Sequence, residues 1–175
     1  MILAIDIGNT TIVIGCINDD KILFTERMST DSNKTVLEYA IGFKTVLELY
    51  HIHTEDLTGS IISSVVPPVT NTVRKALHKI THHQAMVVGP GIRTGLNILM
   101  DNPATTGSDL IVNAVAAIHE YPAPLIIFDF GTATTASVVD RKKNYIGGMI
   151  IPGIRVSLDG LASPTSQLSR ISLDA

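Results

Sequence analysis

Two short segments combine a carboxylate, glycine and hydroxyl groups directly after apolar runs. The first follows the apolar residues 2–5 and contains Asp6, Gly8, Asn9, Thr10 and Thr11. A carboxylate can hold hydrated Mg²⁺ against phosphates, while glycine lets backbone amides approach an anion closely. The segment therefore predicts a phosphate and metal site, although a hairpin with an Asx-type turn would have a similar sequence.

The same pattern recurs later in the chain. There the apolar run 125–128 leads into Asp129, Gly131, Thr132, Thr134 and Thr135. When the two copies are compared without gaps, Thr134 takes the place that Thr11 has in the first. Facing pairs of such turns can hold a polyphosphate from two sides, and this neutralisation of charge suits phosphoryl transfer. We therefore expect a nucleotide clamp built from both copies.

Asp109 is a candidate general base. It follows Gly107 and Ser108, and Ser108 is well placed to cap a helix that runs to about Glu120. A base must lie within hydrogen-bond reach of the substrate hydroxyl. An acidic residue in the first turn is also what the helix dipole favours, so the sequence leaves both roles open.

Other polar and glycine-rich positions are less specific. The histidines at 51, 53, 82 and 83 lie in polar connections without ligand spacing, so a solvated surface is the favoured interpretation over a metal site. Gly147-Gly148 and Pro152-Gly153 could bring the backbone close to a ligand, or could be strand bulges and a turn.

Periodicity predicts the elements that position these residues. Strands are expected in the hairpin 2–13 and at 21–28, 59–66, 86–88, 95–99, 125–128, 135–139 and 145–151. Helices are expected on three apolar stripes: Val36, Ala40, Phe43, Leu47 and Tyr50; Val69, Val73, Ala76, Leu77 and Ile80 after Pro68; and Leu110, Ile111, Ala114, Val115 and Ile118. A further helix is expected at 154–161, and residues 101–106 form a predicted loop.

The order of these elements indicates a duplication. Three antiparallel strands, a helix, a strand and a helix are followed by a second, similar start, which predicts two related α/β halves with a ligand between them. We expect an N-terminal half over residues 1–121 and the start of a second half over residues 122–175. No segment after Ser163 matches residues 60–80, so we expect the second half to be truncated.

Composition excludes several classes of protein. The 175 residues are 45% hydrophobic with a net charge of −3, and Lys and Arg are scattered, so nucleic acid is not an expected partner. Cys16 is the only cysteine, which excludes a disulfide framework and suits a reducing compartment. There is no leader-like segment and no apolar run of roughly 18 residues, so we expect a soluble cytoplasmic protein with no membrane partner.

Taken together, the motifs of this sequence resemble those of a known family, the type III pantothenate kinases. That family belongs to the acetate and sugar kinase, Hsc70 and actin superfamily. The resemblance implies duplicated actin-like, ribonuclease-H-like halves. It is carried, in order, by the segments at 6–11, 63–67, 89–98, 101–103, 107–109, 111–114, 129–135, 147–148 and 152–154.

The resemblance also implies an activity and its residues. The activity is ATP-dependent phosphorylation of pantothenate to 4′-phosphopantothenate, the first step of coenzyme A synthesis, in a cytoplasmic dimer with Mg²⁺ and a monovalent cation, K⁺ or NH₄⁺. ATP would be bound by Asp6, Ile7, Gly8, Asn9, Thr10, Thr11, Ile12, Val13 and Thr132. Asp129 would hold the monovalent cation, Asp6 would hold Mg²⁺ through the phosphates, and Asp109 would accept the proton. The pantothenate side would comprise Met100, Gly107, Ser108, Asp109 and Leu110.

Several positions depart from the family pattern. Leu110 stands where the family usually has Arg, and Met100 where it has Tyr; Ala136-Ser137 replace Phe-Asp, and Pro164 interrupts a helix. Leucine cannot replace the paired donors of a guanidinium. Three hypotheses therefore remain: a pantothenate kinase, most simply a homodimer; a non-catalytic or regulatory paralogue, or a subunit of a hetero-oligomeric kinase; and a related kinase for another small hydroxylated substrate.

Overall fold

The computed structural model describes residues 1–89 and 92–162. Pro164, and Pro90 and Gly91 of the segment 89–98, lie outside the described residues. The chain divides into two compact units, the first formed by Met1–Ile92 with Gly107–Asp109 and the second by Arg93–Thr106 with Leu110–Ala175. This division by compactness differs from the sequence boundary after residue 121, which divides the chain by duplication.

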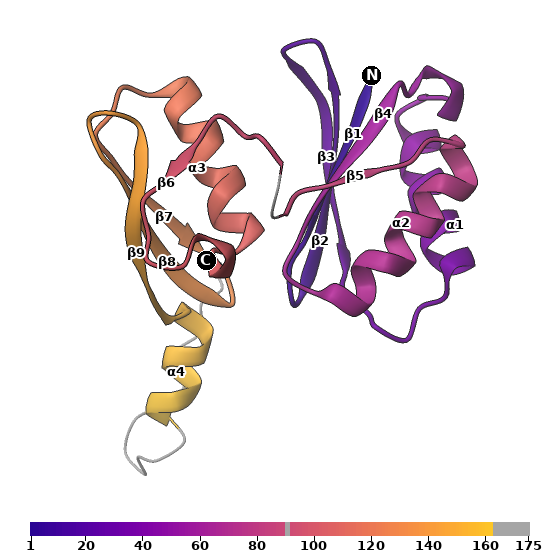
Figure 1. Cartoon of the computed structure of the whole chain (residues 1–175). Helices are drawn as coiled ribbons and strands as arrows, with labels where there is room; N and C mark the ends of the chain where they lie inside the picture. The colour runs from indigo at the N-terminus through magenta and orange to yellow at the C-terminus, as the bar shows by residue number, and fades with distance from the viewer. Residues whose placement is uncertain (90–91, 163–175) are drawn as a thin grey trace. The chain divides into compact units, whose positions relative to one another are not determined.

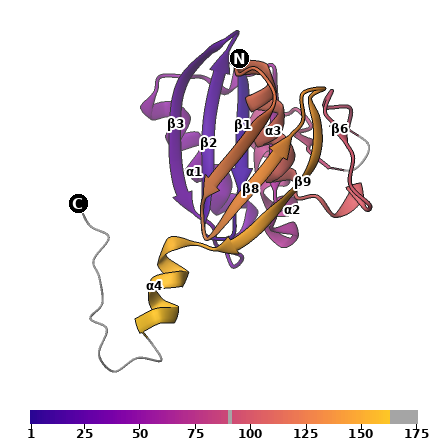
Figure 2. The same cartoon turned by 90° about the vertical axis from the view of Figure 1, so that its left-hand side faces the viewer.

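The first unit contains one mixed sheet of five strands (Figure 1). Its order is β3-β2-β1-β4-β5, made of β1 (Ile2–Ile7), β2 (Thr11–Asn18), β3 (Lys21–Ser29), β4 (Gly59–Ser64) and β5 (Met86–Val87). The first three strands form an antiparallel meander, visible edge to edge in Figure 2. β4 runs parallel to β1, and β5 runs parallel to β4. The predicted hairpin and third strand are thus confirmed.

Two helices cover one face of this sheet, α1 (Val36–Leu49) and α2 (Pro67–Thr81), with the short 3-10 helix η1 (Thr54–Asp56) between them in the chain. α1 begins at a capping box, in which the Thr35 side chain accepts from the Glu38 N–H and the Glu38 carboxylate accepts from the Thr35 N–H. α2 begins at Pro67, whose fixed φ suits the first helical position. Strand β4 consequently ends at Ser64, two residues before the predicted end.

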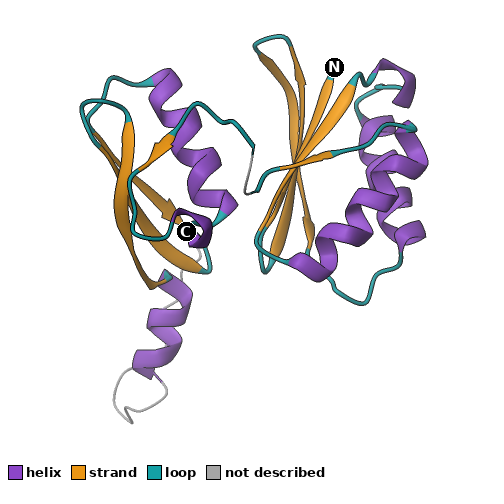
Figure 3. Cartoon of the chain, viewed as in Figure 1, coloured by secondary structure: helices purple, strands orange, loops and turns teal. Residues whose placement is uncertain are grey.

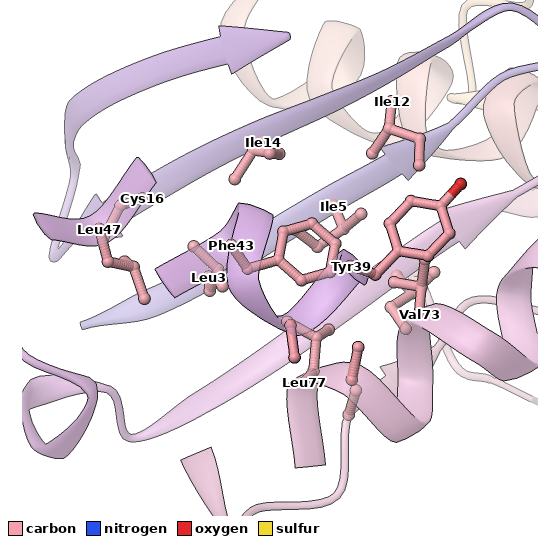
Figure 4. Close-up of a cluster of buried hydrophobic side chains, with 14 of the residues drawn as sticks. Leu3, Ile5, Ile12, Ile14, Cys16, Tyr39, Phe43, Leu47, Val73 and Leu77 are labelled. Carbon is pink, nitrogen blue, oxygen red and sulfur yellow. The ribbon is translucent and has the colours of Figure 1, made fainter. Parts of the chain in front are cut away.

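The core of the first unit lies between these helices and β1–β2 (Figure 4). Alternate strand residues point to it and are at most 2% exposed: Leu3, Ile5, Ile7, Ile12, Ile14 and Cys16. From α1, Tyr39 is fully buried and its hydroxyl donates to the Asp31 carbonyl at 2.8 Å. The predicted apolar stripe omitted Tyr39 and included Tyr50. Tyr50 instead caps the end of the helix, and its side chain is exposed. Burial raises the pKa of the Cys16 thiol, as expected for a small buried apolar group.

The second unit has a four-stranded sheet of order β6-β9-β8-β7. Figure 3 shows the strands of both units in orange and their helices in purple. Its strands are β6 (Asn97–Ile98), β7 (Leu125–Phe130), β8 (Ala133–Val139) and β9 (Asn144–Pro152), and its helices are α3 (Ser108–Glu120), α4 (Ile154–Ala162) and the 3-10 helix η2 (Pro103–Thr105). β7, β8 and β9 form an antiparallel meander that repeats β1, β2 and β3. The α/β class and the repeated start are therefore confirmed, and the predicted loop 101–106 contains a turn of 3-10 helix.

The two faces of the second sheet differ sharply. Ala114 of α3 packs with Val139 and Tyr145 on one face, where it is fully buried. The opposite face exposes large apolar side chains. They are Ile126 (66% exposed), Phe128 (58%), Phe130 (69%), Met149 (62%) and Ile151 (47%). This is the face that, in the first unit, lies under α1 and α2. An exposed apolar surface of this kind is unusual in a monomeric protein.

Candidate active site

The first polar segment forms a tight turn between β1 and β2. The Gly8 N–H donates to the Thr11 carbonyl at 3.0 Å, and a side chain at Gly8 would crowd that oxygen at 3.2 Å. Thr30, which directly follows β3, holds the turn in place. Its hydroxyl donates to the Gly8 carbonyl at 2.7 Å, and its N–H donates to the Thr10 carbonyl at 3.0 Å. The hairpin interpretation and the phosphate-site interpretation are thus both compatible with the geometry.

Asp6 points away from the helices. Its neighbours along β1, Ile5 and Ile7, are buried under α1 and α2, and alternation turns Asp6 to the other face, where it is exposed. Across the parallel ladder Asp6 lies opposite Ser63 of β4. An exposed carboxylate beside a tight backbone turn is a donor set that Mg²⁺ accepts when phosphate supplies the remaining ligands.

Ser63 brings the start of α3 to this position. The Ser63 hydroxyl donates to the Ser108 hydroxyl at 3.3 Å, and the Ser64 N–H donates to the same oxygen at 3.0 Å. The Ser108 hydroxyl in turn donates to the Ser64 carbonyl at 2.9 Å. Asp109 follows directly in the first turn of α3. Within the first unit, two sequence-predicted groups, Asp6 and Ser108–Asp109, are therefore joined through the end of β4.

Gly107 makes room for the carboxylate of Asp109. A Cβ at position 107 would overlap Oδ1 of Asp109 and lie 3.4 Å from its carboxylate carbon. Only glycine leaves the Asp109 side chain where it is. Gly107 was predicted as a neighbour of the base and, from the family resemblance, as a residue of the pantothenate side. Its contact with the Asp109 carboxylate cannot be seen in the spacing.

The second polar segment lies between β7 and β8, and it is one residue shorter. The Gly131 N–H donates to the Ala133 carbonyl at 3.1 Å, so Ala133 occupies the place of Thr11. The gap-free match of Thr11 with Thr134 is wrong. Thr134 instead pairs with Phe130 across the ladder, as Ile12 pairs with Ile7, and it is 5% exposed.

Asp129 lies on the α3 side of the second sheet. Its carboxylate accepts from the Asn113 side-chain amide of α3 at 3.2 Å. Asn113 is not among the residues predicted for the site from the sequence. Its separation from Asp129 in the chain gave no signal, and only the packing of α3 on β7 brings the two together.

Gly148 of β9 and Gly153, which directly follows β9, serve internal packing. A side chain at Gly148 would overlap the Ala136 carbonyl, and one at Gly153 would overlap the Thr132 and Gly131 carbonyls. The Gly153 N–H also donates to the Thr132 carbonyl at 3.2 Å. These approaches are between protein backbones, which favours the structural alternative for this pair of motifs. Thr132 itself lies exposed in the turn.

The two departures among the predicted pantothenate-side residues lie in different surroundings. Leu110 is half-buried and packs against the core of the second unit. Met100 is 36% exposed, and its sulfur accepts from the Thr106 hydroxyl at 3.5 Å. Neither side chain can supply the paired donors that a guanidinium would give.

The described parts of the chain set limits on metal and membrane sites. Within residues 1–89 and 92–162, no three His, Cys, Asp or Glu side chains gather in a way that could hold a metal ion by themselves. A cation at Asp6 or Asp129 would therefore need further ligands of other kinds, such as hydroxyl, amide or backbone oxygens or the substrate. Over the same residues, no helix has the length and apolar character to cross a bilayer.

Comparison with known proteins identifies close relatives. The family model described as type III pantothenate kinase matches residues 2–175. A type III pantothenate kinase of Brevibacillus brevis is 47% identical over 173 residues, and one of Halalkalibacterium halodurans is 44% identical over 173 residues. Each match covers 99% of this chain and 68% of the relative.

Solved structures resemble the chain in fold. A putative 2-dehydro-3-deoxygalactonokinase of Sinorhizobium meliloti matches with a TM-score of 0.56 at 12% identity, covering 95% of this chain and 58% of the other. A putative N-acetylglucosamine kinase of Porphyromonas gingivalis matches with a TM-score of 0.52 at 16% identity. This match covers 85% of this chain and 47% of the other. At these identities the likeness concerns the fold alone.

Proposed function

The chain belongs to the type III pantothenate kinase family, and from this premise we propose that it transfers the γ-phosphoryl group of ATP to pantothenate. The product is 4′-phosphopantothenate, which commits pantothenate to coenzyme A synthesis. The observation that carries the proposal is the match to relatives at 44–47% identity along 99% of the chain.

The proposed reaction is a direct displacement. The primary hydroxyl oxygen of pantothenate attacks the γ-phosphorus, the bond from that phosphorus to the β–γ bridging oxygen breaks, and ADP leaves. Asp109 accepts the hydroxyl proton. Its support is its position in the first turn of α3, beside Gly107 and tied through Ser108 to the end of β4.

The ATP side is assigned to the first turn and to Thr132. Ile7 and Ile12 have fully buried side chains under the helices, so any contact they make with phosphate must come from the backbone. Gly8, Asn9, Thr10 and Thr11 offer amides and hydroxyls, and Asp6 fits Mg²⁺ that is already bound to phosphate. The bound cation would neutralise charge on the transferring group.

The monovalent cation is assigned to Asp129. The Asn113 amide on the Asp129 carboxylate fixes one oxygen and leaves a hard oxygen donor of the kind that K⁺ prefers. A cation there would offset phosphate charge. We assign K⁺ or NH₄⁺ on the family resemblance and on this donor set.

On the acceptor side, the assigned positions are Met100, Gly107, Ser108, Asp109 and Leu110. The Ser108 hydroxyl is engaged with Ser63 and Ser64, so a contribution of Ser108 to substrate would come from its backbone. Leu110 and Met100 favour two other candidate functions: a non-catalytic or regulatory paralogue, and a kinase of this fold that phosphorylates a different small alcohol.

We further propose a cytoplasmic homodimer that binds neither nucleic acid nor membrane. Sedimentation of the purified chain tests the dimer directly, and a single species at the mass of one chain would exclude it. A hetero-oligomer would appear as activity that depends on an added partner subunit.

One experiment tests the activity. The protein is incubated with ATP, Mg²⁺, K⁺ and pantothenate, and the products are followed by mass. Phosphopantothenate is expected, and Asp109→Asn should remove it while ATP binding persists. If folded protein that binds ATP gives no product, a panel of other small alcohols separates a kinase of altered specificity from a non-catalytic paralogue, which would phosphorylate none of them.

A further inference from the structure

The hydroxyl of Ser108 has no capacity left for a ligand. A hydroxyl donates one hydrogen bond and accepts two. Ser108 Oγ donates to the Ser64 carbonyl at 2.9 Å and accepts from the Ser64 N–H at 3.0 Å and from the Ser63 hydroxyl at 3.3 Å. The residue is 9% exposed. Its side chain therefore serves the protein and does not bind substrate.

The Ser108 hydroxyl replaces a missing strand partner. Along β4, the Ile62 carbonyl faces β5 and accepts from the Val88 N–H at 2.7 Å, whereas the Val65 N–H faces β1 and donates to the Ile7 carbonyl. Alternation turns both backbone groups of Ser64 to the β5 side. Strand β5 ends at Val87, so the ladder has no residue there for Ser64. Ser108 bonds both groups in its place.

The side chain of Ser64 is held from a different direction. Its hydroxyl accepts from the Thr70 hydroxyl of α2 at 2.7 Å and from the Val66 N–H at 3.1 Å. Ser64 is thus fixed to α2 by its side chain and to Ser108 by its backbone. Because Ser63 lies opposite Asp6, the first residue of α3 is set relative to the phosphate turn.

We propose that Ser108 is a positioning residue for Asp109. Its three hydrogen bonds fix the first turn of α3 against the end of β4, and this holds the Asp109 carboxylate where it can take the proton of a hydroxyl substrate. The expected effect of Ser108 on kcat rests on the proposed function. The structural consequence, a change in the surroundings of Asp109, does not.

The test compares Ser108→Ala with Ser60→Ala. Ser60 is a matched control because it is a buried serine of the same strand β4 whose hydroxyl has no partner among the described residues. In Ser108→Ala, kcat should fall about 10- to 100-fold, while the KM for pantothenate changes by less than about threefold, since misplacement of a catalytic group slows chemistry more than binding. Ser108→Thr, which keeps the hydroxyl, should recover most of kcat.

Two measurements do not require activity. Amide exchange at Ser64 should quicken in Ser108→Ala, because the Ser64 N–H donates to the Ser108 hydroxyl. The Val65 amide is an internal reference, since it donates to the Ile7 carbonyl instead. The carboxyl ¹³C signal of Asp109 should shift in Ser108→Ala and stay unchanged in Ser60→Ala.

The outcomes separate the alternatives. An unchanged Asp109 signal would overturn the proposal, as would a raised KM with unchanged kcat, which would make Ser108 a substrate ligand. If the unaltered protein phosphorylates no pantothenate, the proposed function fails, and the Asp109 signal alone still decides whether Ser108 positions it.

Discussion

The carboxylate of Asp109 lies so close to Gly107 that a side chain at position 107 would overlap it. A methyl group there would overlap Oδ1 of Asp109, whereas one at Gly160 of α4 would meet no atom within 4 Å. The overlapped atom is the end of a side chain, which can rotate. A substitution at 107 should therefore displace the carboxylate and leave the backbone in place.

Gly107→Ala should consequently lower kcat by about 10- to 100-fold with little change in the melting temperature, because a misplacement of about 1 Å in a catalytic group is costly. Steady-state kinetics and thermal unfolding measure the two effects. Gly160→Ala is the control, and it should keep full activity and gain slightly in stability from its helical position. Full activity in Gly107→Ala would show that the position of this carboxylate does not matter.

Asn113→Ala tests the cation assigned to Asp129. Removing the amide that donates to Asp129 should raise the K⁺ concentration for half-maximal activity by about tenfold, as loss of such supporting hydrogen bonds does at other metal sites. The stabilisation of the protein by KCl relative to LiCl should fall in parallel, which gives a readout independent of turnover. Asn71→Ala, at an exposed position of α2, serves as the control. An unchanged K⁺ response would remove Asn113 from the site.

Much of this arrangement could be predicted from local sequence. The three-strand starts and the stripes of α2 and α3 depend on alternation and on spacing of three and four residues, and both survive folding. The turns placed by Asp6 and Asp129 were also predictable, because glycine and a carboxylate after an apolar run are local features.

Other features depended on information that spacing does not carry. The one-residue difference between the two turns was hidden because position 134 is also a threonine. A gap-free match therefore paired Thr134 with Thr11, although Ala133 occupies that place. The partners of Ser108 and Asp129 lie 44 and 16 residues away in the chain. Such pairs form only when α3 packs, and no local pattern marks them.

The turn between β8 and β9 makes stability depend on pH. The pKa of Asp140 is held below its usual value of 3.8 by hydrogen bonds to its carboxylate. The largest effect comes from the Asn144 N–H, followed by the Asn144 side-chain amide and the Lys142 N–H. A depressed pKa adds stability that is fully present above the unfolded-state pKa and is lost as pH falls through the folded-state pKa.

Asp140→Ala should therefore lower the melting temperature at pH 7, and the gap from the unaltered protein should narrow as the pH drops below about 4 toward about 2. Thermal unfolding across this range measures it, with Asp159→Ala at an exposed position of α4 as the control. A gap that stayed constant to low pH would mean that the charged form of Asp140 contributes nothing to the turn.

Ile5 and Phe128 occupy equivalent positions in the two sheets, since each precedes the aspartate of its turn, yet Ile5 is 2% exposed and Phe128 is 58% exposed. Ile5→Ala should cost about 2–5 kcal/mol in the free energy of unfolding, as buried large-to-small changes do. Phe128→Ala should change it by about 0.5 kcal/mol or less, as expected for surface positions. Urea unfolding of both variants, at several protein concentrations, measures the difference. A large, concentration-dependent cost for Phe128→Ala would contradict the exposed assignment, because it would mean that a second copy of the chain covers this face in solution.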